Sequence, residues 1–512
     1  MSKVESSLKS ISLVSGLSFA RLVVQFVLQV LLAKYFGASK DMDAFVAVLA
    51  FPTVVSMILG GVPYAFIPSF VDRRERVGQQ AAWTMVGNVV LLVGGATLCL
   101  AAVACWQAEL VVKSLFPGFS GEKFETAVKL FRILVWLVLS NGLLSVVQAV
   151  NHAMRRFGVP EASLAVGSLF TLLFIVWRHE SDGILAVGWG VLLGSVTAVV
   201  CQSDLLVRHL RQMKWQLDEG TLRWMRLVVP LVLGAAYYKL DPLVDRYLAS
   251  HLPEGNIAHL GYAWRILNAL LILGTTGLSV VAFPALAKHA SLKDERALQA
   301  EIAHAFRFLC FVLVPVTFGL LFYGRSVVHD LYERGKFLPT DTQAVAVLLI
   351  IYLGTLWGAS LGEVAAKMFY AVGNTVLPIL VGVCGFTVGA VLKILCVPYW
   401  GVNALAAATS FYYLGNSLAL LAFILRRWHW QTLEGVAQAV GRYILASAAA
   451  TGLCWFVVHS GIRFSSFYGA LLGAIVYLSV AFWQKDEFAG RFYEYVQIQV
   501  KRLGVFFSGP KQ

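Results

Sequence analysis

The chain has 512 residues, of which 59% are hydrophobic and only 13% are charged, and its formal net charge is +13. Soluble domains are about a quarter charged, so this composition excludes an ordinary soluble protein and indicates a polytopic membrane protein. The basic residues gather in the short segments between apolar windows, where they set the orientation of membrane helices. The positive charge therefore gives no reason to expect a nucleic-acid partner.

Apolar windows of membrane-spanning length recur along the whole chain and predict an all-α fold with about fourteen transmembrane helices. A bilayer core of roughly 30 Å needs about 20 apolar residues per helix. The windows begin near residues 10, 42, 80, 125, 160, 183, 222, 256, 306, 342, 375, 401, 438 and 464. The excess of Lys and Arg on one side predicts that both termini lie in the cytoplasm.

The first window follows Lys3 and Lys9, as the apolar part of a signal peptide would. It is too long for a signal peptide, contains Arg21 and lacks a small-residue cleavage site. We therefore interpret it as a retained first helix, with a cleaved signal as the alternative.

Four pairs of short segments resemble each other in chain order at a nearly constant offset. ELVVKSLFPGF from Glu109 resembles RSVVHDLYERGKF from Arg325, and GILAVGWG from Gly183 resembles GVNALAAA from Gly401. An even number of helices in each repeat predicts two six-helix bundles of the same orientation, related by a parallel repeat. We place the bundles at residues 1–215 and 216–430, with two additional transmembrane helices and a cytoplasmic tail in 431–512.

Seven basic residues fall within or at the edge of the apolar windows: Arg21, Lys129, Arg132, Lys239, Arg265, Lys367 and Lys393. A charge at the centre of a membrane helix costs about 2.5 to 3.5 kcal/mol on insertion scales. Such a charge normally faces a partner or a wet cavity, so these residues are the candidates for function.

Arg21, Gln25 and Gln29 stand four residues apart and predict one polar stripe on the first helix, as a helix lining a cavity presents. A packing salt bridge between Arg21 and a neighbouring helix is the alternative.

The segment YYKLDPLVDRYLA places Lys239, Asp241 and Asp245 on the seventh helix, where the two aspartates stand one turn apart. Glu363 and Lys367 have the spacing of an ion pair within one helix. Arg21 and Arg265 remain, one near the start of each half, and both are expected to point into a cavity between the halves. Cations in such a cavity suit phosphate or pyrophosphate, because their charge-assisted bonds to phosphate oxygens are strong.

Signatures of enzymes are missing from the sequence. It contains no Walker loop, no GxGxxG at a strand-to-helix turn, no HExxH and no GxSxG. The seven cysteines lie in apolar windows without a CxxC pair, which is typical of small buried residues rather than of a disulfide or metal site. The sequence predicts a transporter that has no cofactor and is coupled to Na⁺, to protons or to the membrane potential.

The runs LLAKYFGASKDMDAFVAVLAFP, AFIPSF, VDRYLAS with GYAWRI, VVAFPALAKHAS and LYERGKF resemble the MviN/MurJ family of lipid II flippases, part of the superfamily of multidrug and oligosaccharidyl-lipid exporters. The resemblance covers nearly the whole chain. It implies a flippase in the bacterial inner membrane that moves an undecaprenyl-pyrophosphate-linked saccharide to the outer leaflet by alternating access. The partners implied are this lipid-linked glycan and membrane lipids, and we expect a monomer.

By the same resemblance, Arg21 and Arg265 match substrate-binding arginines and Asp43 matches the aspartate of the DAF motif. We expect Asp43, Gln25, Gln29 and Lys239 to bind the substrate together with these arginines. Asp241, Asp245 and Lys393 are expected to serve ion coupling or an internal ion pair. The two extra helices would form a groove for the lipid tail. The chain departs from the family where Leu28 and Gln29 replace an Arg-Asp pair. It also departs at Thr53, Val54, Ser56 and Trp264, which stand where the family carries polar or charged residues.

Some family members hold a sodium ion with an aspartate of the seventh helix and polar groups of helices 11 and 12. Here Asp241 or Asp245 matches the aspartate, but helix 11 carries Lys393. We hypothesise that the Lys393 ammonium neutralises that aspartate in place of sodium.

Three other functions stay open at this point. The missing arginines allow a flippase for exopolysaccharide or O-antigen repeat units. A cation-coupled drug exporter of the same superfamily is a second alternative, although such exporters prefer acidic or aromatic cavities. A glycosyltransferase or ligase acting on the same lipid is the third, but it would need acidic residues in the outer loops, where only scattered ones occur, such as Asp330, Glu333 and Asp341.

Overall fold

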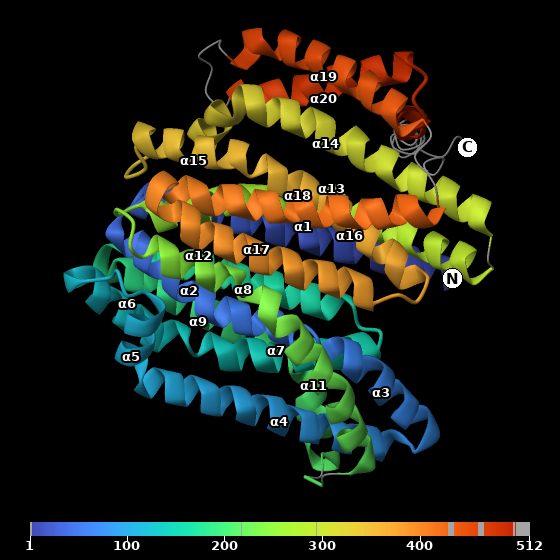
Figure 1. The fold of residues 1–512 in the computed structure, drawn as a ribbon. Coiled ribbons are helices and arrows are strands. Elements are labelled where there is room, and N and C mark those ends of the chain that lie inside the picture. Colours follow the sequence, from blue (N-terminus) through green and yellow to red (C-terminus); the bar gives the residue numbers. More distant parts are fainter. Residues whose placement is uncertain are drawn as a thin grey trace, which may run out of the picture. The chain divides into compact units, whose positions relative to one another are not determined.

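The computed structural model describes residues 3–213, 215–216, 218–292, 294–428, 435–458, 465–494 and 497, and all regular elements within these ranges are helices (Figure 1). Both chain ends, predicted to be cytoplasmic, lie outside the described residues. Contacts divide the chain into two compact units. One contains the described residues up to Ala258 together with Arg334–Phe337, and the other contains His259–Glu333 and the described residues from Leu338 onward.

The first unit contains thirteen helical segments, if the short 3-10 turn η1 is counted with the α-helices. They are α1 (Lys3–Phe36), α2 (Lys40–Leu59), α3 (Val62–Arg76), α4 (Gln79–Trp106), α5 (Ala108–Leu115), α6 (Gly121–Leu134), α7 (Leu137–Ala153), α8 (Gly158–Asp182), α9 (Ile184–Gln202), α10 (Asp204–His209), η1 (Leu210–Gln212), α11 (Glu219–Lys239) and α12 (Asp241–Ala249).

The helix α13 (Asn256–Ser291) begins in the first unit and continues in the second. The second unit also contains α14 (Glu295–Tyr332), α15 (Pro339–Ile351), α16 (Leu353–Ala371), α17 (Val376–Trp400), α18 (Val402–Trp428), α19 (Val436–Val458) and α20 (Ser465–Trp483).

Eleven helical spans among the described residues are long and apolar enough to cross a membrane. Three of these spans are broken into two labelled helices: α2 with α3, α6 with α7, and α15 with α16. The segment α11–α12, the 36-residue α13 and the 23-residue α19 also have the length of a membrane helix. The prediction of a multi-pass, all-helical membrane protein is confirmed.

Two helix pairs have the same construction at matching places in the sequence. The 25-residue α8 is joined to α9 through Gly183, and the 25-residue α17 is joined to α18 through Gly401. Gly183 has φ 56° and ψ −133°, and Gly401 has φ 55° and ψ −136°. Only glycine adopts this region readily, so the turn explains why these two positions resembled each other in the sequence.

The turn that precedes each of these pairs is repeated as well. Arg156 N donates to Asn151 O and Asn374 N donates to Phe369 O, each at 2.8 Å. The residue before each donor, Arg155 or Gly373, has a positive φ. The helices therefore follow an internal repeat, whereas the predicted boundaries near residues 215 and 430 stay a prediction.

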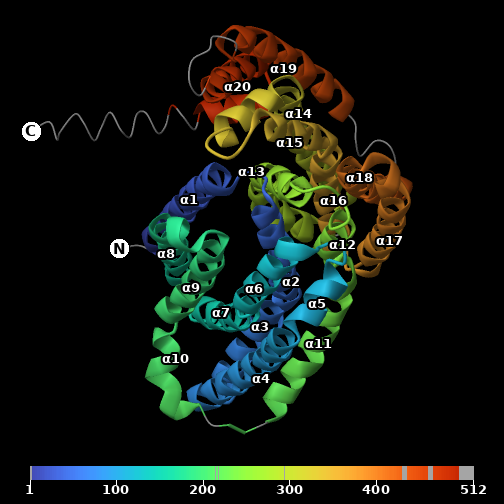
Figure 2. The ribbon, with the colours of Figure 1, turned by 90° about the vertical axis from the view of Figure 1, so that its left-hand side faces the viewer.

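Small residues bring α8 and α9 together (Figure 2). A Cβ on Gly167 would lie 2.4 Å from Gly194 O, and a Cβ on Gly194 would lie 2.5 Å from Gly167 O. Thr171 Oγ1 donates to Gly190 O at 3.0 Å. Without a hydrophobic driving force between helices in lipid, this close backbone approach and interhelical hydrogen bonding stabilise the pair.

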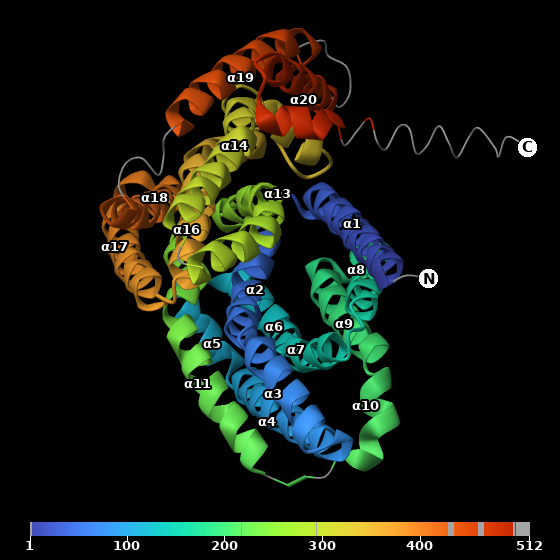
Figure 3. The ribbon, with the colours of Figure 1, turned by 90° about the vertical axis from the view of Figure 1, so that its right-hand side faces the viewer.

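The two additional helices α19 and α20 pack against each other and against α14 (Figure 3). Tyr443 and Tyr477 are buried there with Cys310 and Val314. Tyr477 Oη donates to the carbonyl of Phe311 at 2.8 Å. The additional helices are thus built onto a helix of the repeat.

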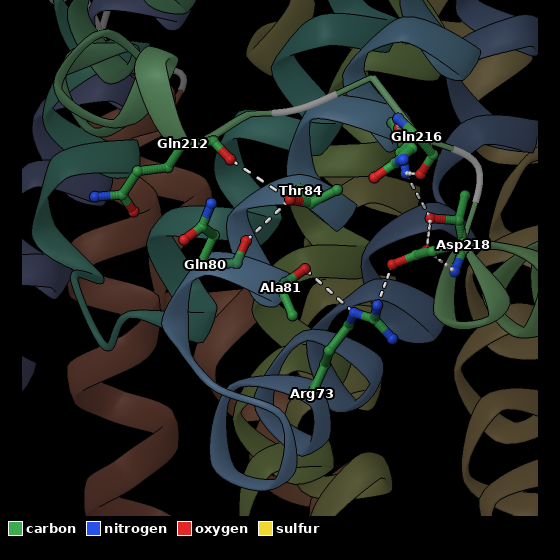
Figure 4. A network of polar contacts seen from close by, with 9 residues as sticks. Arg73, Gln80, Ala81, Thr84, Gln212, Gln216 and Asp218 are labelled. Carbon is green, nitrogen blue, oxygen red and sulfur yellow. Dashed lines mark hydrogen bonds and ion pairs between the residues drawn. The ribbon is translucent and has the colours of Figure 1, made fainter.

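A polar network fixes the segment between α10 and α11 against α3 and α4 (Figure 4). Arg73 pairs with Asp218, the residue that caps α11 by accepting from Thr221 N at 2.9 Å. Asn88 Nδ2 donates to Gln216 O at 2.7 Å and to Thr221 Oγ1 at 2.9 Å. The start of α11 is therefore held by side chains of α3 and α4.

Candidate substrate-binding site

Arg21 lies within the apolar span Val14–Phe36 of α1, which packs on α8. Its guanidinium Nη2 is 3.6 Å from Glu161 Oε2, and the two side chains are 28% and 24% exposed. Ser18 Oγ donates to the same carboxylate oxygen at 3.0 Å. The salt bridge that we weighed as an alternative is therefore present, but both of its side chains remain partly accessible.

The other members of the predicted stripe differ in their surroundings. Gln25 is exposed and Gln29 is half-buried, while Leu28 packs into the core. Gln29 Oε1 is buried without a hydrogen-bond partner in the part of the chain that the structure describes. A buried acceptor without a hydrogen bond costs free energy. The side-chain oxygen of Gln29 can therefore gain stability by accepting a hydrogen bond from a donor outside the described residues.

Neutral hydroxyls and an amide form a chain of hydrogen bonds next to α2, where the family resemblance led us to look for arginines. Asn141 Nδ2 donates to Ser56 Oγ at 2.9 Å, and Ser195 Oγ donates to Asn141 Oδ1 at 3.0 Å. Ser195 and Ser140 hydroxyls lie 2.7 Å apart. This network was not predicted, because single Ser and Asn residues in apolar windows carry little signal.

Asp43 is fully buried, and all the contacts of its carboxylate are with the protein. Oδ2 accepts from Gly255 N and from Lys123 Nζ, each at 2.8 Å, and Oδ1 accepts from Ala258 N at 2.7 Å. An acidic group at a helix N-terminus satisfies its free N–H groups and interacts well with its dipole. Asp43 therefore anchors the start of α13, while its predicted part in substrate binding stays a prediction.

Arg265 lies in the third turn of α13, and its side chain is half-buried. The preceding residue, Trp264, stands where the family carries an acidic residue. Its ring packs edge-on against Tyr352, with 5.8 Å between the ring centroids. An aromatic contact thus occupies the position next to Arg265.

The charged residues of the seventh predicted helix are separated by a break at Leu240, between α11 and α12. Lys239 ends α11, and its ammonium donates to the carbonyl of Met57 in the last turn of α2. Asp241 begins α12 and is half-buried, whereas Asp245 is buried. Lys239 therefore completes the end of α2, which leaves two of its three N–H donors for other contacts.

Lys393 on α17 is fully buried in the second unit. Its ammonium lies 5.8 Å from the centroid of the Tyr412 ring, within the range of a cation–π interaction. The predicted neutralisation of Asp241 or Asp245 by Lys393 stays a prediction. The predicted pair within α16 is confirmed, since Lys367 Nζ and Glu363 Oε1 are 2.6 Å apart.

An apolar cavity of about 460 Å³ lies between α14, α19 and α20, and Ile266 and Leu270 of α13 also line it. Phe311, Tyr323 and Tyr477 contribute to its walls, and Gly469, Ala470 and Gly473 of α20 leave the space open. Apolar pockets of this kind bind apolar chains. The tail groove that the resemblance implies for the additional helices stays a prediction.

Two charged residues of this region were missed in the sequence. Glu161 stands in the first turn of α8 and Lys123 in the first turn of α6, positions that looked like ordinary helix ends. The signal that points to them is charge balance: a buried Asp43 and a membrane-embedded Arg21 each need a partner of opposite sign. Within the described ranges, no group of three or more His, Cys, Asp or Glu side chains is placed to hold a metal ion.

Comparison with protein families gives one family whose sequence profile, described as "Lipid II flippase MurJ", matches residues 32–472. The "Lipid II flippase MurJ" of Burkholderia cenocepacia is 23% identical over 454 residues, which are 86% of this chain and 88% of that protein. The "Probable lipid II flippase MurJ" of Vibrio cholerae is 24% identical over 478 residues, which are 88% of this chain and 89% of that protein.

Two solved structures show the same fold. One is titled "Lipid II flippase MurJ, inward closed conformation" and is similar at 20% identity and a TM-score of 0.79, covering 93% of this chain and 99% of that one. The other, an inward-facing multidrug resistance MATE family transporter of the MOP superfamily, is similar at 13% identity and a TM-score of 0.66, covering 80% and 98%.

Replacing Asp43 by Ala is expected to destabilise the protein strongly. The change leaves the Lys123 ammonium and two backbone N–H groups without their buried acceptor, and breaking a buried charge pair costs about 3 to 5 kcal/mol. Thermal unfolding in detergent measures the loss. Asp41→Ala, on the half-buried neighbouring position, is the control. Equal unfolding temperatures for Asp43→Ala and the wild type would contradict the anchoring role.

Proposed function

Because the chain belongs to the MurJ family of lipid II flippases, we propose that it moves lipid II, an undecaprenyl-pyrophosphate-linked saccharide, from the inner to the outer leaflet of the bacterial inner membrane by alternating access. The observation that carries this proposal is a partly exposed arginine, Arg21, inside an apolar membrane helix. Its charge is costly in that position and suits an anionic headgroup.

In this proposal the diphosphate of the headgroup is bound by Arg21 and Arg265. A guanidinium presents up to five N–H donors in a planar fork that matches phosphate oxygens, and it stays charged under all conditions. Gln25, Gln29 and the free donors of Lys239 add hydrogen bonds to the headgroup. Asp43 contributes indirectly, because it fixes the start of the helix that carries Arg265.

The polyprenyl tail occupies the cavity between α14, α19 and α20. The cavity walls are almost entirely apolar, and small residues of α20 line it along successive turns. An apolar chain in such a groove avoids contact with the polar headgroup region while the headgroup crosses the membrane.

Lipid II is favoured over exopolysaccharide or O-antigen precursors, since the relatives compared above are named as lipid II flippases. The likeness to a drug exporter at 13% identity reflects the fold alone. A drug exporter for cations also fits poorly with two cationic site residues. We propose a transporter without catalytic activity, which works as a monomer, has both termini in the cytoplasm and takes membrane lipids but no nucleic acid as partners.

For energy coupling, we propose that the buried Lys393 supplies the positive charge that a sodium ion provides in some family members. The chain would then require no cofactor and no sodium, leaving protons or the membrane potential as the driving force.

Arg21→Ala is expected to abolish complementation of a strain depleted of its lipid II flippase, because the headgroup loses charge-assisted hydrogen bonds worth about 1.5 to 3 kcal/mol. Arg178→Ala is the matched control, since it removes another arginine–carboxylate pair of the same helix bundle. Membrane insertion should be equal for both variants. Full complementation by an Arg21→Ala, Arg265→Ala double variant would refute the assignment.

Ala470→Trp is expected to fill the apolar cavity and to slow transport of lipids with long polyprenyl tails more than of short-tailed analogues. Leu471→Trp adds the same ring at the neighbouring exposed position outside the cavity and serves as the control. Flipping assays in vesicles with tails of two lengths measure the difference. If Ala470→Trp slowed the transport of long-tailed and short-tailed lipids equally, the tail would not occupy this cavity.

Transport by the wild-type protein is expected to be independent of sodium at a fixed membrane potential. Lys393→Gln removes the built-in charge, so transport should fall and should be restored in part by sodium. Initial flipping rates in vesicles with sodium or choline salts provide the measurement. A steep sodium dependence of the wild type would overturn the coupling proposal.

A further inference from the structure

We propose that Glu161 is a resident counter-ion that occupies Arg21 in the empty transporter and is displaced when the diphosphate headgroup binds. This inference rests on the proposed function, because it requires that Arg21 is a headgroup ligand. It assigns to Glu161 a role in substrate exchange.

The Arg21–Glu161 contact is longer than the two bidentate arginine–carboxylate pairs of the same unit, and it resembles the long contact of the exposed Arg208 with Asp204 at 3.7 Å. Arg178 donates to both oxygens of Asp182 at 2.9 and 3.0 Å, and Arg156 donates to both oxygens of Asp204 at 3.0 and 2.8 Å. Arg21 meets only one oxygen of Glu161, at 3.6 Å. The pair is therefore an electrostatic contact beyond good hydrogen-bond length.

The Arg21 guanidinium also keeps unused donors. Its Nε is buried without a hydrogen-bond partner in the described structure. A buried donor that makes no hydrogen bond costs free energy. The side chain is still 28% exposed. Glu161 contacts only Nη2, so a phosphate group that approaches the exposed part of the guanidinium can bond its terminal N–H groups, and a small shift of the side chain would also bring Nε into reach.

Glu161 has other stabilising contacts when it is displaced from Arg21. It lies in the first turn of α8, where an anionic side chain interacts favourably with the helix dipole. Ser18 Oγ holds its Oε2 at 3.0 Å independently of the guanidinium. Ser18 and Arg21 stand three residues apart on α1 and so lie on the same face of that helix. The carboxylate therefore stays beside the site throughout the exchange.

The exchange serves both halves of a transport cycle. In the empty state Glu161 compensates Arg21, so the transporter can reorient without an unpaired charge in a low-dielectric region. In the loaded state the diphosphate outcompetes one carboxylate oxygen because it offers more charge and bidentate geometry. The neighbouring carboxylate then repels the bound headgroup and favours its release.

The test uses the purified full-length protein and geranylgeranyl diphosphate as a short-tailed probe. Glu161→Gln removes the competing charge, and we expect it to bind the probe about tenfold more tightly, which corresponds to about 1.4 kcal/mol. Glu161→Asp should keep an affinity near that of the wild type. Glu109→Gln, which removes the exposed carboxylate paired with Arg132, should leave the affinity unchanged.

Turnover gives the second readout. Glu161→Gln should slow multiple-turnover flipping while binding improves, a combination that a merely structural role would not produce. In the Arg21→Gln background, Glu161→Gln should have no further effect on binding, because the competition is already gone.

The outcomes separate this inference from the proposed function. If Glu161→Gln leaves probe binding unchanged or weaker while Arg21→Gln abolishes it, the counter-ion role is wrong and the proposed function stands. If Arg21→Gln also leaves binding of the probe unchanged, Arg21 is not a headgroup ligand. The counter-ion role of Glu161 and the proposed role of Arg21 in headgroup binding are then both refuted.

Discussion

The cost of an ionised group away from water governs how this protein is built. Asp43 and Lys123 meet that cost with a close, fully hydrogen-bonded pair that also caps a helix. Arg21 and Glu161 meet it only in part, with one long contact and partly exposed side chains. The first arrangement fixes structure, and the second leaves part of the charged guanidinium accessible. It is this difference that makes Arg21, rather than Lys123, the candidate ligand in the proposed function.

Small residues determine how closely α8 and α9 pack. In α8 and α9, facing glycines let the backbones approach closely enough for a threonine hydroxyl to bond across the helices. The α8–α9 pair is stabilised by contacts of its own. The contacts of Glu161 with α1 are therefore additional to those that hold α8 and α9 together.

The membrane fold was predictable from the sequence because long apolar windows have few alternatives in a bilayer. The repeat was also predictable, and its origin is now visible in the matched turns at Gly183 and Gly401. The candidate arginines stood out because a charge in an apolar window is rare. Their partners did not, since Glu161 and Lys123 lie at helix ends, where charges are common.

The role of Asp43 could not be read from the sequence for a similar reason. Its motif suggested a substrate contact, but only the structure places its carboxylate against backbone N–H groups more than two hundred residues away along the chain. Contacts between such distant segments leave no trace in local spacing. The long contact between Arg21 and Glu161 joins two helices in the same way, so its geometry was equally out of reach.

The contacts of Arg73, Asn88 and Asp218 at the start of α11 have a consequence for how the chain can be divided. These side chains bind the beginning of α11 to α3 and α4, and α11 belongs to the first compact unit. A protein expressed as two fragments that are cut just before α11 would therefore separate this helix from the residues that hold its first turn.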